Sequence, residues 1–260
     1  MATGETTATG PRKPFSGECA SHAGRRRVEN EDAFWLDEDI GLAAVADGVS
    51  SAHGGGVAAE ICVRTVGTFF AQRGSALRAA EDPRACVELV RQALEAARKA
   101  MASEAEDRRM LGMATTLTVL LRLRGHVVLA NLGDSRVYRI RDGRMQQLTH
   151  DHTLLAESLR AGVVPLAANA GRLGATITRY MSPRDRMEAQ FYADLWQDRD
   201  MYLLCSDGLS TYVPEPVILD VILRAANLEE AVHNLVGAAN QCGGFDNVTA
   251  VLVRLRQLPS

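Results

Sequence analysis

The 260-residue sequence predicts an α+β fold, in which β-sheets pack against each other and helices cover the outside. Three observations lead to this prediction. Short β-type runs follow one another and are separated by turn residues, which favours antiparallel pairing. The helical patterns come in pairs and do not alternate one for one with the strands. The hydrophobic content of 47% is enough for one large core, and no internal Pro/Gly/Ser-rich stretch marks a domain boundary.

Ten segments have the strand pattern, and many are bounded by turn residues. Asp142-Gly143 lies between two of them and predicts a hairpin. The predicted strands cover residues 15–20, 33–36, 41–46, 115–122, 126–132, 136–140, 144–148, 176–180, 201–205 and 248–254.

Apolar residues at helical spacing predict two long helices, at residues 56–72 and 83–104. A C-terminal helical region covers residues 214–241 and is interrupted near Asn227. Between residues 151 and 175 the pattern weakens to a short helix followed by an Ala/Gly-rich stretch. We expect this segment to be a flap-like excursion from the sheet, although a plain surface loop is equally compatible with the sequence.

Composition narrows the class of protein. Residues 1–14 are rich in Thr, Gly and Ala, which predicts a disordered lead-in to a single domain at residues 15–256. The net charge of −3 gives no overall attraction to nucleic acid or to an anionic membrane, and the apolar runs are too short to span a bilayer. Five cysteines without a Cys-x-x-Cys pair predict reduced thiols. We therefore expect a cytoplasmic protein.

Acidic residues lie at the ends of the predicted strands, where five short motifs interrupt or abut an apolar run. These are Asn30-Glu31-Asp32, Ala46-Asp47-Gly48, Gly133-Asp134-Ser135, Ser206-Asp207-Gly208 and Phe245-Asp246-Asn247. A carboxylate there costs desolvation energy, which a bound cation offsets. One such motif alone is better explained as a turn or a helix cap. Five together favour a site for Mg²⁺ or Mn²⁺, which prefer oxygen ligands.

With these motifs in this order, the sequence resembles the metal-dependent PPM, or PP2C-type, protein serine/threonine phosphatases of the compact bacterial type. The resemblance extends from Phe15 to Arg254. It also includes Ala114-Thr115-Thr116, Leu148-Thr149-His150-Asp151-His152 and Ile177-Thr178-Arg179. The resemblance implies a four-layer α-β-β-α sandwich, with two central, mainly antiparallel sheets flanked by helix pairs.

The resemblance also implies roles for single residues. Asp47 would bridge two metal ions, and the Gly48 carbonyl, Asp207 and Asp246 would add ligands. Glu31 and Asp32 would act mainly through metal-bound water. Asp134 would join Asp207 in binding a third, weaker ion.

Two further residues are expected to act on the substrate. Arg27 would hold the phosphate, because a guanidinium matches phosphate oxygens bidentately. The alternative for Arg25-Arg26-Arg27 is a solvated basic run or a small nucleic-acid patch. His53 is the candidate general acid, although its loop is one residue longer than the common bacterial form, and a loop histidine without a catalytic part is the alternative.

The expected function is hydrolysis of phosphoserine and phosphothreonine in proteins by metal-activated water, without a phosphoenzyme. The substrate would be a phosphoprotein made by a serine/threonine kinase, and the enzyme a monomer. A catalytically silent phosphoprotein-binding scaffold of the same fold is one alternative, which the retained acids argue against. A metal-dependent phosphodiesterase acting on small nucleotides is another.

Overall fold

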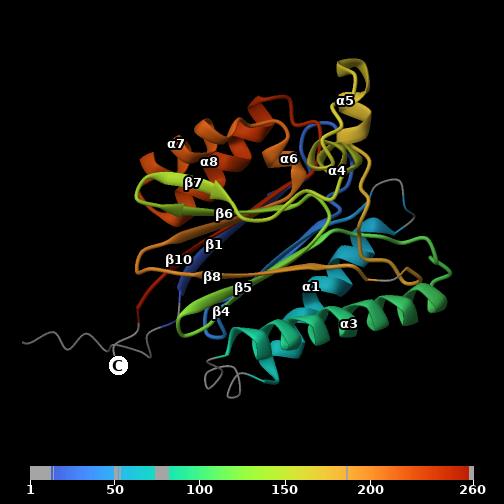
Figure 1. Ribbon diagram of the computed structural model, residues 1–260, viewed down its shortest axis with the longest axis horizontal. Coiled ribbons are helices and arrows are strands. Elements are labelled where there is room, and N and C mark those ends of the chain that lie inside the picture. Colours follow the sequence, from blue (N-terminus) through green and yellow to red (C-terminus); the bar gives the residue numbers. More distant parts are fainter. Residues whose placement is uncertain are drawn as a thin grey trace, which may run out of the picture.

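The chain folds into a sandwich of two five-stranded sheets, with a pair of helices on each outer face (Figure 1). The computed structural model describes residue 13 and residues 15–49, 52, 54–73, 82–185 and 187–257. The lead-in expected at residues 1–14 lies outside the described residues, apart from Lys13. Both sheets are antiparallel throughout.

The first sheet has the strand order β1-β10-β9-β6-β7. Its first and last strands along the chain are neighbours, and Phe15 pairs with Leu255 and His22 with Val248. The strands are β1 (Phe15–His22), β6 (Arg136–Arg141), β7 (Arg144–Gln147), β9 (Met201–Cys205) and β10 (Val248–Leu255).

The second sheet has the order β2-β3-β4-β5-β8. Its middle strands are almost continuously apolar because they are covered on both faces, by the other sheet and by helices. The strands are β2 (Asp32–Asp37), β3 (Leu42–Asp47), β4 (Leu117–Arg122), β5 (His126–Leu132) and β8 (Gln190–Leu195).

Four long helices form the outer layers. Helices α1 (Gly55–Ala71) and α3 (Pro83–Asp107) contact each other below the second sheet in Figure 1, and α7 (Glu215–Arg224) and α8 (Leu228–Gln241) cover the first sheet. Local sequence sets their starts. The Asp82 side chain accepts a hydrogen bond from the backbone N–H of Arg84 at the start of α3, and the Asn227 side chain caps α8 through Glu230.

Three groups of buried side chains correspond to the three interfaces between the four layers. One joins α1 and α3 to the second sheet and includes Phe70, Leu94 and Met101. Another joins α7 and α8 to the first sheet. The third lies between the sheets, around Leu129 and Tyr202. The predicted four-layer sandwich is therefore confirmed.

Two details of the predicted elements were wrong. β8 was not predicted. The segment 176–180 is no strand, because its backbone pairs with the start of α4 (Leu154–Arg160): Leu154 N–H donates to the Thr176 carbonyl, and Thr178 N–H to the His152 carbonyl. The Ala/Gly-rich stretch of the expected flap-like excursion contains a second short helix, α5 (Ala167–Gly174). No described helix is both long and apolar enough to cross a membrane.

Candidate active site

The predicted acidic residues gather at one end of the sandwich. Asp32 begins β2, Asp47 ends β3, and the two are direct partners across these antiparallel strands. Asp207 follows β9 as the first residue of α6 (Asp207–Ser210), and Asp246 lies two residues before β10. Asp134 lies in the turn between β5 and β6. Antiparallel pairing thus brings five carboxylates from distant parts of the chain to the same end of the sandwich, where these strands begin or end.

The backbone around Asp47 is fixed by the Thr115-Thr116 pair. Asp47 N–H donates to the Thr116 hydroxyl at 2.9 Å, and the Asp47 carbonyl accepts bonds from Thr116 N–H at 2.8 Å and from the Thr115 hydroxyl at 2.9 Å. Gly48 follows where the chain passes close to the start of α1. A Cβ atom at Gly48 would lie 2.4 Å from the Gly55 carbonyl carbon, so only glycine fits.

Asp32 is held by a buried serine. The Ser206 hydroxyl donates to Asp32 Oδ2 at 2.7 Å and accepts a bond from Thr249 N–H at 2.9 Å. The other oxygen, Asp32 Oδ1, is buried and has no hydrogen-bond partner among the described residues. A buried carboxylate oxygen without a partner carries a large desolvation penalty, which a cation would remove.

Asn247 ties the loop before Asp32 to the site. Its side-chain oxygen accepts a bond from Glu31 N–H at 2.9 Å, and its NH₂ group donates to the carbonyls of Ala23 at 3.0 Å and Glu29 at 2.8 Å. The loop that carries Arg27 and Glu31 is thereby held beside Asp246. The Glu31 side chain lies against the first turn of α1, since its Oε1 would be 3.1 Å from a Cβ atom at Gly55.

Arg27 reaches the acidic residues directly. Its Nη2 donates to Asp246 Oδ2 at 2.9 Å, and both side chains are partly exposed. In this arrangement the guanidinium is the cation that pairs with Asp246. A metal ion bound by Asp246 would compete with Arg27 for this carboxylate.

Burial and repulsion between neighbouring carboxylates raise the pKa values of Asp32, Asp47, Asp134 and Asp207. Burial, opposed by the hydrogen bond from Ser206, raises the pKa of Asp32 to about 7. Burial together with Asp246 raises the pKa of Asp207 to about 6, and burial together with Asp207 raises that of Asp134 to about 7. Burial and the charge of Asp32 raise the pKa of Asp47 well above its usual range. Positive charge at this edge would therefore be strongly favoured.

The donor set fits divalent cations. It contains only oxygen atoms from carboxylates and from the Gly48 carbonyl, which are the ligands of Mg²⁺ and Mn²⁺. Among the residues that the structure describes, no three acidic, His or Cys side chains are arranged to enclose a single ion. The fit rests on the chemistry of the donors and on Asp32 Oδ1, which is buried without a partner in the part of the chain that the structure describes.

A buried histidine holds the turn that carries Asp134. The backbone N–H of Gly133 donates to the ring atom Nδ1 of His152 at 3.1 Å. The backbone N–H of His152 donates to the Gly133 carbonyl at 3.0 Å. His152 Nε2 lies 3.2 Å from Gln190 Oε1, which makes Nε2 the protonated nitrogen, because Nδ1 accepts. Burial lowers the pKa of His152, so the ring stays neutral.

Sequence reasoning named the acids but missed their supports: Thr115, Thr116, His152, Ser206 and Asn247. Each stands inside or beside a motif that carries the family resemblance, and this position is the signal that could have found them. His53, the candidate general acid, lies outside the described residues.

Comparisons with known proteins identify the family of the chain. Residues 20–241 match the family described as "Protein phosphatase 2C". The chain is 33% identical to the serine/threonine phosphatase stp of Listeria welshimeri, over 91% of this chain and 94% of that protein. It is 29% identical to the protein phosphatase PhpP of Streptococcus pneumoniae, over 90% of this chain and 95% of that protein.

Solved structures are similar to the chain as well. The crystal structure of the Mycobacterium tuberculosis serine/threonine phosphatase PstP matches with a TM-score of 0.81 and 30% identity, over 93% of this chain and 99% of that one. The catalytic domain of PstP in complex with two manganese ions matches with a TM-score of 0.80 and 28% identity, over 93% and 98% of the two chains. The chain therefore belongs to the protein phosphatase 2C family and is a phosphoprotein phosphatase.

Proposed function

We propose that the five-carboxylate group is the catalytic centre of a protein serine/threonine phosphatase that hydrolyses phosphoserine and phosphothreonine. The observation that carries the proposal is the convergence of these acids at one end of the sandwich, where the structure describes no hydrogen-bond partner for Asp32 Oδ1. Bound cations would offset the repulsion between these carboxylates. Cations also promote phosphoryl transfer, because they stabilise the charge on the phosphoryl oxygens. The names of the stp, PhpP and PstP relatives support the same reaction.

The metal ligands we propose are those of two core ions, Mn²⁺ or Mg²⁺: Glu31, Asp32, Asp47, the Gly48 carbonyl, Asp207 and Asp246. The manganese complex of the PstP catalytic domain supports this proposal. When bound, such cations neutralise charge on the phosphoryl oxygens and lower the pKa of water. Hydrolysis then needs no nucleophilic side chain and no phosphoenzyme.

The chain's own residues position the reactants. Thr115 and Thr116 fix the Asp47 backbone, and Ser206 orients Asp32. Arg27, which exchanges its partner Asp246 for the substrate, binds the phosphate and stabilises its charge in the transition state. We propose His53 as the donor of a proton to the departing Ser or Thr oxygen. His53→Gln should then slow hydrolysis of phosphopeptides and spare aryl phosphates, whose leaving group departs without protonation.

Asp134 is the proposed ligand of a third, weaker ion, which it shares with Asp207. The repulsion from Asp207 that helps to raise the pKa of Asp134 supports their proximity. Asp134→Ala should leave two manganese ions bound per chain and lower kcat on phosphopeptides. If instead stability falls while the folded fraction keeps its kcat, Asp134 only stabilises its turn.

The test of the proposed function is phosphate release from a phosphothreonine peptide with and without Mn²⁺. A phosphotyrosine peptide and a phosphodiester serve as controls. We expect Mn²⁺-dependent release from the first substrate and little from the others. Release from the diester alone would identify a phosphodiesterase, and no release from any substrate a silent scaffold.

The substrates we propose are phosphoproteins produced by a serine/threonine kinase, with the enzyme acting as a monomer in the cytoplasm, without nucleic-acid or membrane partners. All five cysteines are free thiols, which supports a reducing compartment.

A further inference from the structure

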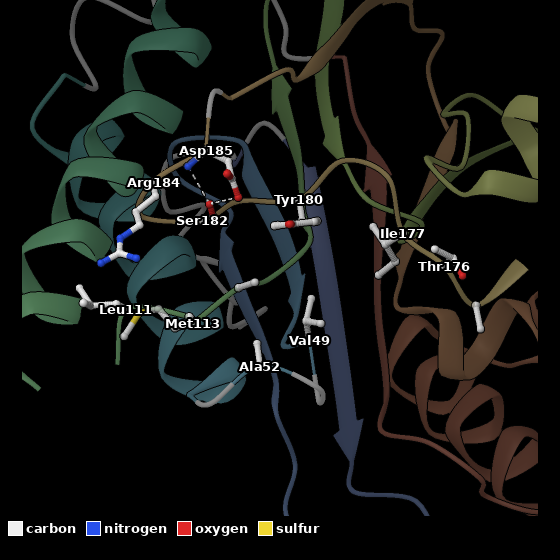
Figure 2. Close-up of a pocket in the computed structure, with 13 residues that line it drawn as sticks. Val49, Ala52, Leu111, Met113, Thr176, Ile177, Tyr180, Ser182, Arg184 and Asp185 are labelled. Carbon is white, nitrogen blue, oxygen red and sulfur yellow. Dashed lines mark hydrogen bonds between the residues drawn. The ribbon is translucent and has the colours of Figure 1, made fainter. Parts of the chain in front are cut away.

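A cavity of about 470 Å³ lies next to Val49, the residue that follows Gly48, and combines apolar walls with a polar edge. Figure 2 shows Leu111 and Met113 on one side, Ile177 on the other, Val49 and Ala52 along the bottom, and Tyr180 between the two sides. Ser182, Arg184 and Asp185 form a polar edge, where the Ser182 hydroxyl donates to Asp185 Oδ2 at 2.7 Å.

The cavity wall and the site share a segment of backbone. Val49 directly follows the proposed metal ligand Gly48, and its N–H donates to the Ala114 carbonyl at 3.0 Å. Next to this bond, Thr115 pairs with Gly48 on one side and with Met181 on the other. The backbone that fixes Asp47 therefore also forms the cavity wall, and the apolar surface starts where the metal ligands end.

We propose that this cavity, which we call the flank pocket, receives an apolar side chain of the phosphoprotein substrate next to the phosphorylated residue. The Cα atoms of Asp47 and Val49 are at most ~7 Å apart, since each residue extends the chain by about 3.5 Å. A phosphate bound at the carboxylates thus places the residues one to three positions away at the pocket. A site bordered by Val49, Leu111, Ile177 and Tyr180 favours aliphatic or aromatic side chains there and disfavours charged ones.

This inference rests on the proposed function, because the phosphate must bind at the five-carboxylate group. The wild-type enzyme is assayed with Mn²⁺ on phosphothreonine peptides that carry alanine at positions −3 to +3, except for one leucine that is moved through them. We expect kcat/KM to rise about tenfold for leucine at one flanking position, as is usual when an apolar group enters a fitted pocket. Aspartate at that position should give no rise.

The decisive variant is Gly112→Phe. Gly112 lines the flank pocket, and a Cβ atom there meets no atom of the described residues within 4 Å, so the backbone leaves room for a side chain to begin at this position. Gly125→Phe is the matched control, because Gly125 is equally open and lies in the turn between β4 and β5. Gly112→Phe should reduce the leucine preference to less than about twofold, and Gly125→Phe should keep it. Both should hydrolyse an aryl phosphate at the wild-type rate.

Leu111→Ala is a second test of the leucine preference, for the case that Gly112→Phe does not fold. It removes an apolar wall at a residue that is already 40% exposed and should weaken the leucine preference while leaving aryl phosphate hydrolysis unchanged. Absence of any flanking preference in the wild type, or a preference that survives both substitutions, would overturn the flank pocket. If wild-type enzyme hydrolyses no substrate at all, the proposed function fails instead.

Discussion

Asp207 shows how a single charge links catalysis to stability. It is partly buried at the start of α6, and burial together with the charge of Asp246 raises its pKa. We expect Asp207→Asn to reduce turnover ~100-fold or more, because it removes negative charge from the proposed ion site. The same substitution should raise the melting temperature of the metal-free protein, since it removes a buried charge.

Turnover, Mn²⁺ affinity and thermal melting on the same sample test this expectation. Asp220→Asn is the control, because Asp220 is an exposed residue of α7 whose pair with Arg224 is worth little. Near-normal turnover of Asp207→Asn would contradict the two-metal proposal.

Arg27 and Arg26 are neighbours with different surroundings. Arg27 pairs with Asp246, whereas Arg26 lies 5.7 Å from the centroid of the Phe245 ring. We expect Arg27→Ala to raise KM for a phosphothreonine peptide about tenfold or more, through loss of a charge-assisted contact to phosphate. The affinity of the Arg27→Ala variant for Mn²⁺ should not fall, because the Arg27 guanidinium no longer competes with the ion for Asp246.

Arg26→Ala serves as the matched control and should leave KM within about twofold. If wild type and Arg27→Ala have equal KM values, Arg27 does not bind the phosphate, and the alternative of a solvated basic run is correct.

At the scale of elements, the contact between α1 and β2 is unusually close. Gly67 of α1 lies on the Trp35 ring, and a Cβ atom there would come within 2.2 Å of a ring carbon. Gly67→Ala should therefore destabilise the protein by ~1–3 kcal/mol, as overpacking does. Gly237→Ala on α8 meets no atom within 4 Å and should instead stabilise by ~0.5–1 kcal/mol, from helix propensity alone.

Urea unfolding measures both variants. The midpoint should move in opposite directions, with the slope unchanged. A stable Gly67→Ala would mean that α1 can shift away from β2 at little cost.

The sequence predicted elements well where side-chain patterning alone decides the structure. β5 was predicted at its observed bounds, because every residue after His126 is buried. β8 was missed because its half-exposed pattern, with Asp194 near its end, is specified by pairing with β5 at the sheet edge. The segment 176–180 has strand-forming residues, but its backbone pairs with the residues at the start of α4. Local sequence does not reveal this contact, because it depends on the tertiary structure.

The same distinction holds for the site. The acids could be predicted because each disrupts an apolar run, a local signal. The ion pair of Arg27 with Asp246, and the three bonds from Asn247, join segments more than 200 residues apart. Nor could the flank pocket be predicted, since Val49, Leu111 and Ile177 meet only in the folded chain.

At the scale of the whole molecule, the acidic residues govern how stability depends on pH. The folded pKa values of about 6 to 7 for Asp32, Asp134 and Asp207 exceed the ordinary value of about 3.9. Between roughly pH 4 and 7 the folded metal-free protein thus holds more protons than the unfolded chain. The stabilisation is full at the lower pH and is lost as pH rises towards 7.

We expect urea midpoints in the presence of a chelator to fall between pH 5 and 7 and then level off. Mn²⁺ should reverse this trend, because its binding displaces protons and strengthens as pH rises. Asp207→Asn should show a shallower pH dependence without metal. Midpoints that increase from pH 5 to 7 in the chelated wild type would contradict these assignments.

The pairing of β1 with β10 places Phe15 beside Leu255, at the end of the first sheet away from the carboxylates. Seven residue steps separate Phe15 from His22, or about 23 Å at the usual strand rise. A domain tethered by a short linker to either residue would sit on the side opposite the phosphate chemistry. Such a tether could confine the phosphatase to a location in the cell, or hold it near its kinase, without screening the catalytic face. A force that pulled Phe15 and Leu255 apart would break the β1–β10 hydrogen bonds one after another. The two strands would separate first at Phe15 and last at His22, next to the catalytic end of the sheet.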